Sequence, residues 1–71
     1  MRETHQLFQA AASLLRQGAF IQEASSEPIT YRLHYAGDSA PIAGHLVQQL
    51  LAHRLVRPTC RVSGKMRYLA V

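Results

Sequence analysis

A strict alternation of apolar and polar side chains over residues 29–35 restricts the possible folds of this chain more than any other feature. The apolar positions are Ile29, Tyr31, Leu33 and Tyr35, and the polar positions between them are Thr30, Arg32 and His34. A period of two residues is typical of a β-strand that is buried on one side only. We therefore expect a sheet with one covered face, and the covering elements must come from the rest of the chain.

The segment before this strand predicts a helix and then a shorter strand. Residues 4–17 carry an apolar stripe at helical spacing, formed by Leu7, Phe8, Ala11, Leu14 and Leu15. Gly18 stands where helices often end in a left-handed residue. Residues 19–24 predict a strand, and Pro28 helps to define a turn at 25–28. These two strands should form a hairpin.

A second helix is expected to begin near Asp38, because the residues there are typical of a helix start. Asp38 or Ser39 can cap the first turn, and Pro41 is suited to a position inside it. The apolar side of this helix would hold Ile42, Ala43, Leu46, Val47, Leu50 and Leu51. Its other side would hold short or hydrogen-bonding residues and no acid: Gly44, His45, Gln48, Gln49 and Ala52.

The C-terminal part predicts a second hairpin. Residues 59–62 and 66–71 are strand candidates, and Gly64 lies in the turn between them, where a positive φ is needed. Cys60 alternates with Arg61, so we expect it to be a small buried residue. The chain then forms one α+β domain over residues 1–71 in the order α-β-β-α-β-β. Both helices would pack on one sheet or on two β-hairpins, in a winged-helix-like arrangement.

Length and composition exclude several classes of protein. A chain of 71 residues buries only about 60% of its unfolded surface, and its one cysteine allows no internal disulfide. No apolar run approaches the roughly 20 residues that cross a bilayer, and no long apolar signal sequence is present. We therefore expect a cytoplasmic protein with a reduced thiol and no membrane association.

Charge is distributed unevenly along the chain. Residues 1–38 hold three basic and four acidic side chains, a net charge of −1. Residues 39–71 hold five basic side chains and no acid, a net charge of +5. A basic half of this kind is expected of a protein that binds a polyanion, although a charged surface that only maintains solubility gives the same count.

No residue pattern indicates catalysis or metal binding. The four acids are scattered, and no nucleophile elbow, P-loop or paired-histidine zinc motif is present. The four histidines and Cys60 lack the spacing of known metal sites. We expect neither an enzyme nor a cofactor.

The basic half predicts a nucleic-acid site instead. In a helix-turn-helix protein the second helix enters the major groove, where Gln can pair with adenine. Basic residues of a following wing can contact phosphate or the minor groove. The candidate residues are His45, Gln48, Gln49, Arg54, Arg57, Arg61, Lys65 and Arg67. Ordinary exposed residues of an amphipathic helix would show the same pattern.

A family resemblance points the same way. The segments LLRQGAFIQEASSEPITYRL, APIAGHLVQQLLAHRLVRP and GKMRYLAV follow one another. Together they resemble small winged-helix-like proteins of bacteria and their mobile elements, and the order is similar to that of the toxin-like YjhX family. The resemblance implies a DNA-associated or regulatory role. One departure is that a typical winged helix has three helices before its wing, whereas a hairpin stands between the two expected here.

Two functions are compatible with these observations. The first is a small DNA-binding, transcription-regulating protein that contacts double-stranded DNA, as a homodimer if one copy offers too few base contacts. The second is a protein-binding adaptor or inhibitor from a phage, plasmid or other mobile element, whose basic face binds an acidic protein partner.

Overall fold

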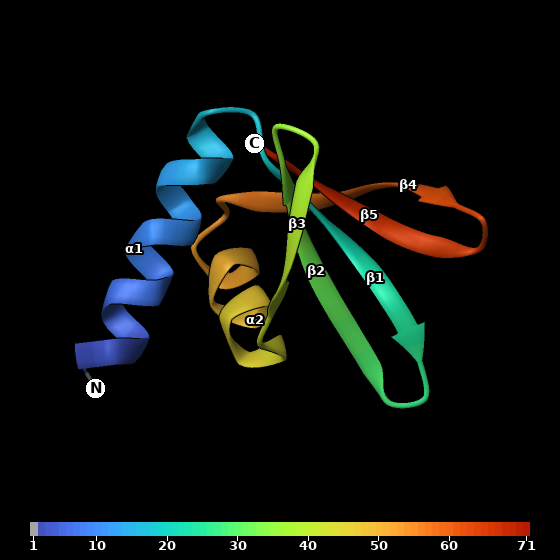
Figure 1. The fold of residues 1–71 in the computed structure, drawn as a ribbon, viewed down its shortest axis with the longest axis horizontal. Helices are drawn as coiled ribbons and strands as arrows, with labels where there is room; N and C mark the ends of the chain where they lie inside the picture. Colours follow the sequence, from blue (N-terminus) through green and yellow to red (C-terminus); the bar gives the residue numbers. More distant parts are fainter. Residues whose placement is uncertain (1) are drawn as a thin grey trace.

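A computed structural model describes residues 2–71, and the side chains of all of these except residues 2–5 and 26. The elements follow in the order α1 (Arg2–Arg16), β1 (Phe20–Ser26), β2 (Ile29–Tyr35), β3 (Asp38–Ile42), α2 (Gly44–Ala52), β4 (Val56–Val62) and β5 (Lys65–Ala70). The strands form one antiparallel sheet with the spatial order β3-β2-β1-β5-β4. The α+β class is confirmed, and the two hairpins belong to one sheet (Figure 1).

The expected order of elements is wrong at residues 38–42, which form the strand β3 and not the start of a helix. Ala36 and Gly37 both have positive φ, 54° and 87°. Two such residues make a tight turn whose twist matches that of antiparallel strands. The turn therefore places Asp38 opposite Tyr35 and continues the sheet. The observed order is α-β-β-β-α-β-β.

Helix α2 begins after Ala43, later than predicted. Ala43 has an extended backbone and makes no side-chain hydrogen bond to the helix, so neither Asp38 nor Ser39 caps it. The residues that bury its apolar side are Leu46, Val47 and Leu50. Pro41 lies in β3, an edge strand, where a residue without an N–H group is tolerated.

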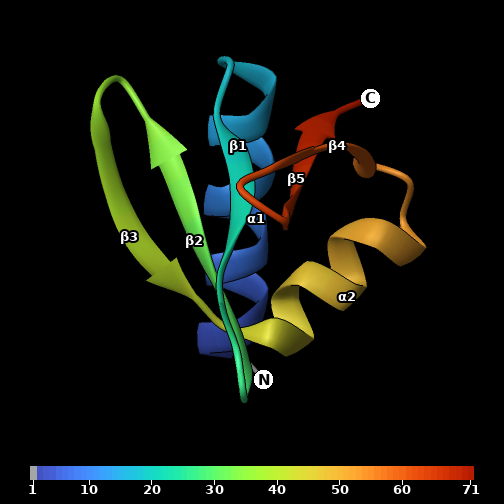
Figure 2. The same ribbon diagram turned by 90° about the vertical axis from the view of Figure 1, so that its right-hand side faces the viewer.

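Both helices pack on the same face of the sheet. Ala11 and Leu15 of α1 and Val47 and Leu50 of α2 share one buried cluster with Ile21 of β1. Ile21 is opposite Leu33 on one side and Tyr68 on the other, which places it near the centre of the sheet. In Figure 2 the sheet is seen from its other side, with strand β1 in front of α1. That other side is covered by neither α1 nor α2, and we call it the open face.

The prediction that Cys60 is buried is wrong, because its side chain is exposed. The pairing of β4 with β5 shifts by one residue between Pro58 and Cys60, and such a bulge changes the alternation of faces. Cys60 consequently lies opposite Arg67. The hairpin also extends beyond the helices (Figure 1), so neither α1 nor α2 covers it there. Its turn at Ser63 and Gly64 has positive φ at both residues, as expected for Gly64.

Candidate nucleic-acid interface

The structure divides the eight predicted site residues between different surfaces. His45, Gln48 and Gln49 are exposed on α2, on the side opposite its buried residues. Arg54 follows α2 in the turn before β4, and it borders a hollow with residues of α1 and the end of β5. These four residues therefore belong to the helical layer of the molecule.

The remaining four residues lie on the β4–β5 hairpin, and the strand register gives their directions. Arg67 and Lys65 alternate along β5 with Tyr68, which packs against the core. Arg57 is opposite Leu69, one position from the Pro58–Tyr68 pair. Successive residues of a strand point to opposite faces, so Arg57, Lys65 and Arg67 are on the open face. Arg61 is opposite Met66 and points to the other side.

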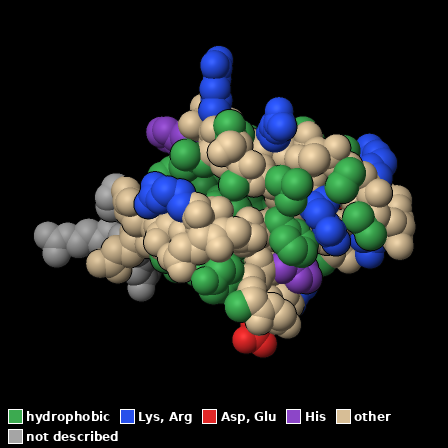
Figure 3. All heavy atoms as spheres, turned by 90° about the horizontal axis from the view of Figure 1, so that it is seen from above, with side chains coloured by type: hydrophobic (Ala, Val, Ile, Leu, Met, Phe, Trp, Pro, Cys, Tyr) green, Lys and Arg blue, Asp and Glu red, His purple; other side chains and the backbone are tan. Residues whose placement is uncertain are grey.

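The open face gathers basic and planar side chains from four of the five strands, β1, β2, β4 and β5. Register places there Phe20 and Gln22 of β1, Thr30, Arg32 and His34 of β2, Ser39 and Pro41 of β3, Arg57, Cys60 and Val62 of β4, and Lys65, Arg67 and Leu69 of β5. Among the side chains that the structure describes, none of those on the open face is acidic. Glu23 lies on the helical side, where one carboxylate oxygen accepts a hydrogen bond from the Met66 N–H at 2.8 Å. Figure 3 shows Lys and Arg side chains with hydrophobic side chains between them at the right-hand end of the molecule, and further Lys and Arg side chains at its upper edge and in its left half.

A row of three planar groups crosses the middle of this face. The rings of His34 and Phe20 are parallel, with 3° between their planes and 4.9 Å between centroids. The guanidinium carbon of Arg67 lies 4.4 Å from the Phe20 centroid. Strands β2 and β5 flank β1 on opposite sides, so the imidazole and the guanidinium cover opposite faces of the phenyl ring. We call His34, Phe20 and Arg67 the planar row.

Hydrogen bonds hold the end of the planar row in place. Arg67 Nε donates to Gln22 Oε1 at 2.9 Å, and Gln22 Nε2 donates to the backbone oxygen of Lys65 at 3.1 Å. The guanidinium is thus fixed both by the phenyl ring and by an amide whose own position is fixed. A cation that is ordered in advance loses less entropy when it binds an anion.

The other basic groups of the open face are also bound to neutral oxygens. Lys65 Nζ donates to the Ala24 carbonyl at 2.8 Å. Arg32 donates from Nε to Ser39 Oγ at 3.0 Å and from Nη2 to the Ser39 carbonyl at 3.2 Å. Because these acceptors carry no formal charge, the positive charge of Arg32, Lys65 and Arg67 is not neutralised by them. Together with Arg57 we call these residues the open-face cations.

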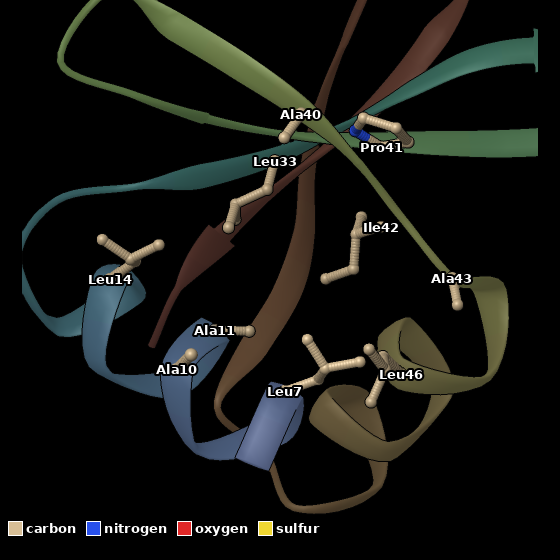
Figure 4. Close-up of a pocket in the computed structure, with 10 residues that line it drawn as sticks. All are labelled: Leu7, Ala10, Ala11, Leu14, Leu33, Ala40, Pro41, Ile42, Ala43 and Leu46. Carbon is tan, nitrogen blue, oxygen red and sulfur yellow. The ribbon is translucent and has the colours of Figure 1, made fainter. Parts of the chain in front are cut away.

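An apolar groove lies on the opposite side of the molecule (Figure 4). It has a volume of about 210 Å³ and separates α1 from the β2–β3 hairpin and the start of α2. Its lining consists of Leu7, Ala10, Ala11, Leu14, Leu33, Ala40, Pro41, Ile42, Ala43 and Leu46. None of these side chains carries a charge or a hydrogen-bonding group. The groove therefore offers apolar contacts and no side chain that could take part in a reaction.

Other kinds of site find no support in the described part of the chain. No group of three or more His, Cys, Asp and Glu side chains there is placed to hold a metal ion. Helices α1 and α2 are each too short or too polar to cross a membrane. Burial raises the pKa of Tyr68, and the neighbouring Tyr31 and Glu23 raise it further. This phenol packs against the core on the helical side of the sheet, so it is not part of the open face.

Sequence reasoning identified the open-face cations other than Arg32, but not the groups between them. Phe20, Gln22 and His34 were placed in strands without any functional role. Their proximity depends on which strands pair and in which register, and the local pattern does not contain that information. Comparison of the chain with protein-family models, with curated proteins and with solved structures gives no significant match in any of the three.

Proposed function

We propose that this protein binds nucleic acid through the open face of its sheet. The observation that carries the proposal is the open face itself: four cations without a described acid among them, arranged around a row of planar groups. Phosphate groups are attracted to such a surface at long range, and each Arg guanidinium can donate two parallel hydrogen bonds to one phosphate. Residues 39–71 as a whole also carry a positive net charge, +5.

This surface differs from that of a winged helix, which would use α2 as a recognition helix. The exposure of His45, Gln48 and Gln49 favours that second mode, in which α2 enters the major groove of double-stranded DNA. Helix α2, however, spans only Gly44–Ala52, and the cations nearest to it in sequence are not on one surface. Arg54 accompanies α2 in the helical layer, whereas Arg57 is on the open face.

These two exposed arginines make a matched pair for the test. We would measure fluorescence polarisation of labelled DNA with the Arg57→Glu and Arg54→Glu variants at low salt. Both substitutions change the net charge by two units, so a general electrostatic effect weakens both equally. Binding through the open face predicts at least a tenfold larger loss for Arg57→Glu. The opposite order, together with a loss in Gln48→Ala, would place the ligand on α2.

Absence of binding by the unaltered protein at low salt would refute the proposal as a whole. The second function, binding of an acidic protein partner through the basic face, would then be the one to test. That result would direct attention to protein partners, which the same two variants could test.

A further inference from the structure

The shape and chemistry of the open face point to one class of ligand within the proposed function. We infer that the open face binds single-stranded nucleic acid, and that its bases stack on the ends of the planar row. This inference rests on the proposed function, because it assumes that the open face is the binding surface. It adds which strand form is bound and which groups contact the bases.

The width of the sheet argues against a duplex. Five strands spaced by about 4.8 Å make a surface roughly 19 Å across, whereas the major groove of B-DNA is about 12 Å wide. A single helix or a two-stranded ribbon enters that groove, but the face of a five-stranded sheet does not. A B-form duplex lying on this face without deformation would contact it mainly through phosphates. The planar row would then have no partner.

A single strand can bring its bases to the sheet. Unpaired bases expose their flat faces, which stack on aromatic rings and on guanidinium planes. In the free protein both faces of Phe20 are occupied, one by His34 and one by Arg67. A base can therefore stack only at an end of the planar row, either on the outer face of the His34 imidazole or on the outer face of the Arg67 guanidinium. Phe20 contacts both end groups, His34 and Arg67, and holds them in the row.

The open-face cations surround this row in a way that suits the backbone of a single strand. Arg32 lies on β2 beside the edge strand β3, while Arg57 lies on β4 at the other edge of the sheet. Lys65 begins β5 next to the turn of its hairpin. Phosphates on either side of the stacked bases thus meet positive charge. Stacking and phosphate contact are both tolerant of base identity, so we expect little sequence preference.

The test separates stacking from charge. Labelled single strands of about 12 nucleotides, one of DNA and one of RNA, are compared with a DNA duplex of the same length. Phe20→Leu keeps an apolar side chain but removes the ring, and Arg67→Lys keeps the charge but removes the plane. Arg54→Lys is the matched control, because it makes the same exchange at an exposed arginine of the helical layer, outside the open face. Phe20 lies outside the buried core cluster, so the Leu variant should stay folded, which circular dichroism checks.

The inference predicts tighter binding of at least one single strand than of the duplex. Phe20→Leu and Arg67→Lys should each weaken single-strand binding by about five- to 150-fold, the range measured for the loss of one stacked base. Arg54→Lys should change it less than about threefold. Preference for the RNA or the DNA strand would identify the natural form.

Two results would overturn the inference. One is a duplex bound as tightly as both single strands. The other is single-strand affinity that is unchanged in Phe20→Leu and Arg67→Lys. If Arg57→Glu still abolished binding in either case, the open face would remain a nucleic-acid surface without stacking. Failure of every oligonucleotide to bind at low salt would instead refute the proposed function.

Discussion

Replacement of Ala36 by glycine should stabilise the protein, although it removes a side chain. Ala36 has a φ of 54° in the turn between β2 and β3. The left-handed conformation brings the β-carbon of an L-residue close to the next carbonyl oxygen, which costs roughly 1–2 kcal/mol. Glycine avoids this contact. Its greater freedom in the unfolded chain offsets about 0.5–1 kcal/mol of the gain.

The expected net gain is about 1 kcal/mol. In a domain of this size a change of that magnitude raises the melting temperature by about 4–8 °C. The matched control is Ala40→Gly, the same chemical change in the strand β3, where Ala40 pairs with Leu33. Glycine within a strand costs about 0.5–1 kcal/mol relative to alanine, so the control should lower the melting temperature.

Thermal unfolding followed by circular dichroism measures both variants under one condition. The reasoning requires shifts of opposite sign, because it depends on a left-handed turn at Ala36 and an extended chain at Ala40. A fall in melting temperature for Ala36→Gly would show that this residue is not left-handed in solution. The assignment of residues 38–42 to a strand would then lose its physical basis.

Three other predictions concern binding, packing and pH. If a single strand pairs its phosphates with the four open-face cations, a plot of log affinity against log salt concentration should have a slope of about −2.8. The affinity would then fall about 50-fold between 50 and 200 mM salt, and an affinity that does not change with salt in polarisation titrations would exclude phosphate contact. Leu50 is fully buried, so Leu50→Ala should destabilise the domain by about 2–5 kcal/mol in urea unfolding, and a loss below about 1 kcal/mol would mean a loosely packed core. The raised pKa of Tyr68 means that the folded state holds the phenol proton more tightly than the unfolded state does, so the stability that this proton contributes below about pH 10 is lost as pH rises through the raised pKa. Between neutral pH and about pH 11 the urea midpoint of Tyr68→Phe should therefore fall less than that of the unaltered protein.

Local sequence patterns were sufficient to predict most of the elements. The alternation from Ile29 to Tyr35 predicted β2, and the stripe from Leu7 to Leu15 predicted α1. Gly18 and Gly64 have the positive φ expected where the chain leaves α1 and turns between β4 and β5. At these places the local preference and the tertiary structure agree.

Strand β3 could not be predicted in the same way. Asp38, Ser39 and Pro41 are suited to a helix start, and equally to a short edge strand. The difference is made by the turn before them, and Ala36 gives no sign in the sequence that it is left-handed. Pairing with β2 then satisfies the backbone of these residues.

The candidate site shows a similar division. Charge could be counted from the sequence, so the open-face cations other than Arg32 were among the predicted residues. The planar row could not be found, because Phe20, His34 and Arg67 are neighbours only after β2, β1 and β5 pair in their observed register. Cys60 was wrongly placed because a bulge of one residue is not visible in an alternating pattern.

The two outermost strands of the sheet have a consequence for self-assembly. β3 contains Pro41 and β4 contains Pro58, and these are the strands with one unpaired edge each. A proline provides no N–H group for a further ladder, and its ring obstructs an approaching strand. The sheet is therefore protected against edge-to-edge polymerisation at both ends. Any homodimer of this protein should form through a face of the domain and not by joining two sheets into one.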